Sequence, residues 1–105
     1  MTKRRVNHQP PVVNIGDGVT YSVGSDAYPY TVIGVERNNR KLILQSDHAV
    51  RVDNNGMSES QEYDITPDPE GSIIEVTWKP SLGCYGSQYS RYYVGHRRKH
   101  RDPHF

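Results

Sequence analysis

The sequence has little cysteine, phenylalanine or tryptophan, and it has no long run of apolar residues. Cys84 is the only cysteine, which excludes an internal disulfide framework and favours a reducing compartment. No stretch approaches the roughly 18 apolar residues that a membrane-spanning helix needs. Residues 1–10 are basic at the start but do not form the apolar core of a signal peptide. We therefore expect a cytoplasmic protein.

Motifs of catalysis and of metal binding are also missing. There is no Gly-rich phosphate loop and no serine-centred elbow. Glu62 and Asp64 would share one strand face as a solvated acidic row, whereas acid–base catalysis needs carboxylates in different environments. Pro103 would end any helix that lined up the three histidines near the C-terminus, His96, His100 and His104. We expect no enzymatic activity, no cofactor and no bound metal.

The composition indicates one small domain with a thin core. Only 33% of the 105 residues are hydrophobic, and eight are tyrosine, which suits core edges as well as binding surfaces. Residues 1–12 are predicted to be a disordered basic arm and residues 13–105 a single β domain, with the C-terminal basic tail packed back on it. Because a partner can supply missing burial, we expect a homo-oligomer.

Short alternating segments with Gly and Pro turns between them predict an antiparallel β fold. Strands are expected at 19–23, 28–36, 41–45, 49–52, 61–65, 72–78 and 91–94, and residues 79–90, which include Cys84, are expected to form a flexible loop. Ile74, Val76 and Trp78 should share a buried face. The expected fold is mainly β, a small antiparallel barrel or a strongly bent sheet. Residues 16–19 and 32–35 are similar to the start of SH3-like barrels.

Charge is unevenly distributed, and two segments are unusually polar. Residues 47–75 carry eight acidic side chains against one basic, whereas residues 76–105 carry six basic against one acidic. Residues 51–61 are either a solvated hairpin loop or one wall of a polar site. The tail at 95–101 could bind nucleic acid, close over an anionic ligand, or dock on the acidic middle of the chain.

Six polar or turn-rich motifs stand at residues 24–26, 28–32, 52–61, 68–71, 95–98 and 102–105. Together these motifs resemble a family of small proteins found in bacteriophages and bacterial genomes. The resemblance runs from about Gly16 to the C-terminus, with a departure in the Tyr- and Gly-containing loop at 79–88. It implies a phage-type context and marks the polar segment and the Arg tail as family features, but it implies no settled activity.

The polar residues of these motifs could together orient a planar, anionic ligand. We expect a ligand-binding site at Ser25, Asp26, Tyr30, Thr31, Asp53, Asn54, Asn55, Ser58, Ser60, Gln61, Arg97 and Arg98. The favoured hypothesis is a phage-type accessory protein that binds a nucleotide-like ligand and sequesters a host immune signal in the host cytoplasm. The alternatives are a protein–protein inhibitor of a host enzyme, a structural virion component, and a small barrel that binds nucleic acid or nucleoprotein.

Overall fold

A computed structural model of the chain describes residues 9–53, 62–87 and 90–95. This part of the chain is built from β-strands and contains no helix, which confirms the predicted fold class. The strands are β1 (Gly18–Val23), β2 (Asp26–Glu36), β3 (Lys41–Ser46), β4 (His48–Arg51), β5 (Tyr63–Thr66), β6 (Ile73–Lys79), β7 (Cys84–Gly86) and β8 (Arg91–Val94).

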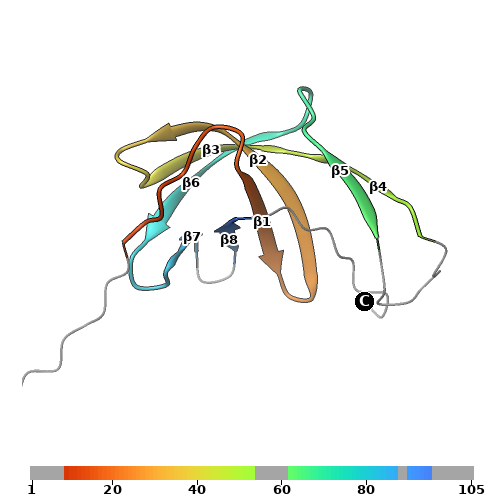
Figure 1. Cartoon of the computed structure of the whole chain (residues 1–105). Helices are drawn as coiled ribbons and strands as arrows, with labels where there is room; N and C mark the ends of the chain where they lie inside the picture. Colours follow the sequence, from red (N-terminus) through yellow and green to blue (C-terminus); the bar gives the residue numbers. More distant parts are fainter. Residues whose placement is uncertain (1–8, 54–61, 88–89, 96–105) are drawn as a thin grey trace, which may run out of the picture.

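Six strands close into an antiparallel barrel in the order β1-β2-β3-β6-β7-β8 (Figure 1). The first and last strands close it, because Val19 lies opposite Val94 and Tyr21 lies opposite Tyr92. The ladder between β2 and β3 is irregular between Val32 and Gly34. Such a bulge increases the local bend of a strand, which helps a small sheet to close. The barrel that the sequence predicts is therefore confirmed.

The remaining two strands, β4 and β5, form a separate two-stranded sheet to one side of the barrel (Figure 1). They continue the β3–β6 pair beyond a corner, where the amide of Ser46 donates to the carbonyl of Ser72 at 2.9 Å. Gly71 permits this corner, because a Cβ atom there would lie 2.1 Å from the backbone oxygen of Ser46. Residues 66–71, which contain two prolines and end in Gly71, thus separate the small sheet from the barrel.

Turn chemistry explains the two tight hairpins of the barrel. Gly24, with a φ of 55°, supplies the left-handed residue between β1 and β2. The turn between β2 and β3 uses three consecutive residues of positive φ, Arg37, Asn38 and Asn39. Asparagine tolerates this conformation better than most side chains. Asn39 is also fixed from both sides, because its side-chain oxygen accepts from Val13 N and its carbonyl accepts from the Tyr85 hydroxyl.

The core fills the barrel and follows the alternation of the strands. Trp78 is 8% exposed and packs edge-on against Tyr85, with ring centroids 5.0 Å apart. Ile74 is half-buried against the same cluster, so the shared buried face predicted for β6 is confirmed. The buried cluster consists of Val13, Val19, Val32, Leu42, Leu44, Val76, Trp78 and Tyr85.

The prediction for residues 79–90 is wrong in one respect. The segment contains β7, in which Cys84 and Tyr85 are almost completely buried. Burial raises the pKa of the Cys84 thiol, so this cysteine is a small core residue in a strand and not part of a flexible loop. The predicted disordered arm at 1–12 falls mainly on residues 1–8, outside the described residues. The C-terminal tail beyond Gly95 lies outside them too.

Candidate functional site

Four tyrosines from three strands gather at one end of the barrel. Val19 and Tyr21 share a face of β1, and Tyr30 shares a face with the buried Val32 of β2, so the tyrosines extend the inward-facing rows of the core. The rings of Tyr21 and Tyr92 are stacked, with centroids 4.5 Å apart. Tyr30 meets Tyr92 edge-on at 5.8 Å, and Tyr28 lies 6.0 Å from Tyr21.

A pocket of about 420 Å³ opens beside this cluster, between the tyrosines and the corner where β3 passes into β4. Its volume falls in the range of small-molecule sites. We refer to it as the tyrosine pocket. It is lined by Tyr21, Tyr28, Pro29, Tyr30, Ser46, Asp47 and Ala49.

Asp47 is held in place in the wall of the tyrosine pocket. Its backbone amide donates to the carbonyl of Pro29 at 3.0 Å, and its carboxylate accepts a hydrogen bond from the Thr31 hydroxyl. Pro29 lies where β2 pairs with β1 alone, before pairing with β3 begins at Tyr30. A strand tolerates proline at such a position, where its missing N–H removes no ladder hydrogen bond.

The hydroxyls of Tyr30 and Tyr92 keep their protons at neutral pH. Burial, with smaller contributions from Tyr21 and Tyr28, raises the pKa of Tyr30. Burial also raises the pKa of Tyr92 to about 12. These groups can therefore donate hydrogen bonds, while the nearby Asp47 carboxylate can accept them. The pocket combines aromatic faces with both kinds of hydrogen-bonding group.

The structure brings three of the predicted site residues to this pocket. Tyr30 lines it, Thr31 positions the Asp47 carboxylate, and Asp26 accepts from the hydroxyl of Tyr28 at 3.3 Å. Ser25 is exposed in the turn between β1 and β2 and does not line the pocket. Seven further predicted residues lie outside the described residues, namely Asn54, Asn55, Ser58, Ser60, Gln61, Arg97 and Arg98.

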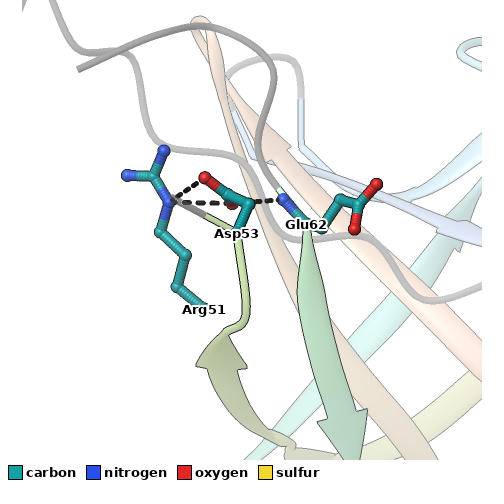
Figure 2. A network of polar contacts seen from close by, with 3 residues as sticks. All are labelled: Arg51, Asp53 and Glu62. Carbon is teal, nitrogen blue, oxygen red and sulfur yellow. Dashed lines mark hydrogen bonds and ion pairs between the residues drawn. The ribbon is translucent and has the colours of Figure 1, made fainter. Parts of the chain in front are cut away.

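Asp53, the remaining predicted residue, makes hydrogen bonds that join the ends of β4 and β5. Its carboxylate accepts from Arg51 Nε at 2.9 and 3.1 Å and from the backbone amide of Glu62 at 2.6 Å (Figure 2). The Asp53 side chain is only 5% exposed. The hydrogen bond with Asp53 raises the pKa of Arg51, so the guanidinium stays charged. Asp53 therefore orients Arg51 and ties β4 to β5.

Sequence reasoning missed most of the lining of the tyrosine pocket. It did not single out Tyr21, Tyr28 or Asp47 of the lining as site residues, nor Tyr92, which stacks on Tyr21. Alternation alone places Tyr28 and Tyr30 on one face of β2, and that was the available signal. The approach of Tyr92 to Tyr21 and Tyr30 depends on barrel closure, which pairs β8 with β1 and joins residues about 70 positions apart.

Other site chemistries find little support in residues 9–53, 62–87 and 90–95. Among these residues, no three His, Cys, Asp or Glu side chains are placed so that they could hold a metal ion. Glu62 and Asp64 are both exposed, as predicted for a solvated acidic row. No helix with the length and apolar character of a membrane span occurs in this part of the chain.

Comparison with known proteins gave no match to a family model, to a curated protein or to a solved structure. The phage-family resemblance and the similarity to SH3-like barrels therefore stay predictions from the sequence.

Proposed function

We propose that the protein is a non-enzymatic binder of a small, planar, nucleotide-like ligand, and that the tyrosine pocket is its binding site. The observation that carries the proposal is the arrangement of Tyr21, Tyr28 and Tyr30 around a pocket of about 420 Å³, with Asp47 in its wall. Three rings from two strands offer flat apolar faces, and the carboxylate offers a directed acceptor.

The chemistry of the pocket suits a nucleobase. Stacking on an aromatic side chain contributes about 1–3 kcal/mol per base. An exocyclic amine on the edge of the base can donate to Asp47, as acidic side chains do toward cytosine in nucleic-acid complexes. Because Thr31 and the Pro29 carbonyl already position Asp47, little side-chain ordering is needed when the ligand arrives.

The biological role that fits this binding is ligand sequestration. In the phage-type context that the sequence resemblance implies, a small binder without a catalytic set would capture a nucleotide-type immune signal in the host cytoplasm. The proposal requires only that the ligand be held and not converted.

Calorimetry against a panel of nucleosides, nucleotides and short single-stranded oligonucleotides tests the proposal. Tyr28→Ala removes one wall of the pocket and should weaken binding at least about tenfold, from the loss of one stacking contact. Tyr93→Ala is the matched control, because Tyr93 is 43% exposed and does not line the tyrosine pocket.

The outcomes separate the proposed function from its alternatives. Binding of mononucleosides or mononucleotides that depends on Tyr28 supports the proposal. Binding of oligonucleotides alone would favour the nucleic-acid alternative, since clustered tyrosines can also stack successive bases of a single strand. Absence of any binding across the panel would overturn ligand capture and favour a protein partner.

A further inference from the structure

One face of the small sheet continues the surface of the tyrosine pocket. Ala49 lines the pocket, and Arg51, two residues further along β4, projects from the same face of the strand. Tyr63 of β5 lies opposite Arg51, and Ile65 lies opposite Ala49. These four side chains are half-buried, whereas the opposite face of the sheet is exposed at His48, Val50, Val52, Asp64 and Thr66.

Among the described residues, Asp53 contacts the Arg51 guanidinium through its Nε atom alone. Asp53 engages its Nε atom with both carboxylate oxygens, and Asp53 is itself held by the Glu62 amide (Figure 2). The Nη2 atom is buried and has no hydrogen-bond partner among the described residues. A guanidinium presents five N–H donors in a planar fork that suits phosphate. Arg51 thus keeps donor capacity after its contact with Asp53.

We propose that Arg51 forms an anion subsite that extends the tyrosine pocket along β4, and that the ligand is a nucleotide whose phosphate contacts this residue. The inference rests on the proposed function and adds the part of the ligand that the tyrosines do not recognise. Asp47 accepts from the base, the tyrosine rings stack on it, and Arg51 donates to the phosphate.

The spacing along the strand agrees with the size of a nucleotide. At about 3.3 Å per residue, Arg51 lies about 7 Å beyond Ala49 along β4, and at most about 13 Å from Asp47, which precedes β4 at the corner. The exocyclic amine and the phosphate lie at opposite ends of a nucleoside monophosphate, so the two charged residues would contact its two ends. Since Asp53 offsets part of the Arg51 charge, the subsite acts through directed hydrogen bonds more than through net charge.

The test compares nucleosides with their monophosphates, adenosine with AMP and guanosine with GMP, by calorimetry on the full chain. Intact protein should bind each monophosphate at least about tenfold more tightly than its nucleoside. Arg51→Gln should remove this advantage and leave nucleoside binding unchanged. Arg51→Lys keeps the positive charge but loses the planar fork of N–H donors, so it should keep only part of the preference for the monophosphate. Arg40→Gln is the charge-matched control, because Arg40 is exposed and does not line the tyrosine pocket.

The results distinguish the subsite from the binding function itself. If nucleosides bind and the phosphate adds nothing, or if the advantage survives both Arg51 variants, the subsite is overturned and the proposed function stands. If neither nucleosides nor nucleotides bind the intact protein, both proposals are overturned. A thermal melt accompanies each variant, because Arg51 also ties Asp53 in place. If Arg51→Gln fails to fold, the Arg51→Lys result decides.

Discussion

At the scale of single residues, tyrosine occupies several core and core-edge positions that leucine or phenylalanine fills in larger cores. The chain has eight tyrosines and one phenylalanine. Tyr85 is fully buried and satisfies its hydroxyl on the Asn39 carbonyl. Tyr21, Tyr30 and Tyr92 instead form the boundary between the core and the pocket. A ring with a polar tip allows one residue type to fill both positions.

Trp78 should be the most sensitive single position in the core. Replacing Trp78 with Ala removes its edge-on contact with Tyr85 and should lower the free energy of unfolding by about 3–5 kcal/mol. Urea denaturation of Trp78→Ala beside Thr77→Ala measures the effect. Thr77 is exposed on the same strand, so its change should stay within about 0.5 kcal/mol. A loss below about 1 kcal/mol for Trp78→Ala would contradict its burial.

The buried tyrosines should make the fold sensitive to alkaline pH. Unfolded tyrosine ionises near 10, whereas burial raises the pKa of Tyr85 and of Tyr92 to about 12. Between these values the unfolded chain releases more protons than the folded chain, so the free energy of unfolding should fall as the pH rises from about 10 to about 12. Denaturant melts across this range measure the slope. Tyr92→Phe should reduce it, and a slope that Tyr92→Phe leaves unchanged would argue against burial of this hydroxyl.

At the scale of elements, the β4–β5 sheet depends on a few polar contacts and not on the barrel core. Its free end is closed by the hydrogen bond from Val52 N to Glu62 O at 2.9 Å and by the contacts of Asp53. Two strands without a shared core are marginal on their own. The sheet is therefore the part of the described fold that a single side chain can loosen.

Asp53→Ala should loosen this sheet without unfolding the barrel. The substitution leaves Arg51 Nε and the Glu62 amide without their acceptor, so amides of β4 and β5 should exchange with solvent faster. Hydrogen exchange followed by mass spectrometry compares these strands with β1, β2 and β3. Asp64→Ala is the control, because Asp64 is exposed on β5. Equal acceleration throughout the barrel would show that the two sheets unfold together.

At the scale of the whole molecule, the barrel is closed by its most distant strands. β8 pairs with β1 along four positions and adds Tyr92 and Val94 to the edge of the core. Closure protects the edges of β1 and β8, which would otherwise expose unpaired backbone groups. The tyrosine pocket depends on the same contact, because Tyr92 of β8 stacks on Tyr21 of its wall.

A chain that ends at Ser90 should therefore lose its cooperative fold. It lacks β8, so β1 keeps one neighbour only and the Tyr21 ring loses its stacking partner. Thermal unfolding followed by circular dichroism and by Trp78 fluorescence measures the loss. A chain that ends at Gly95 keeps all eight strands and separates the effect of β8 from that of residues 96–105. A sharp melt from the shorter chain would show that closure is dispensable.

The sequence by itself determined the described strands other than β7, most turns and the buried face of β6. Alternation from Val19 to Val94 and the turn residues at 24, 37–40 and 66–71 are local signals, and local backbone preferences express them directly. Trp78 could be assigned to the core for the same reason, since it shares a face with Ile74 and Val76. The polar residues Asp26, Tyr30 and Thr31 could be selected as site candidates, but not placed around one pocket.

Only the tertiary structure decided where β7 lies, how the barrel closes and which residues line the pocket. Cys84 and Tyr85 sit among glycines, so their segment has no strand signal of its own, and it becomes a strand because β6 and β8 offer ladders on both sides. The contacts of Asp47 with Thr31 and Pro29, and the pairing of Arg51 with Tyr63, likewise join separate segments of the chain. Pairing between distant segments depends on the apolar surface that they bury together. That burial is a property of the folded chain, so a short stretch of sequence does not reveal it.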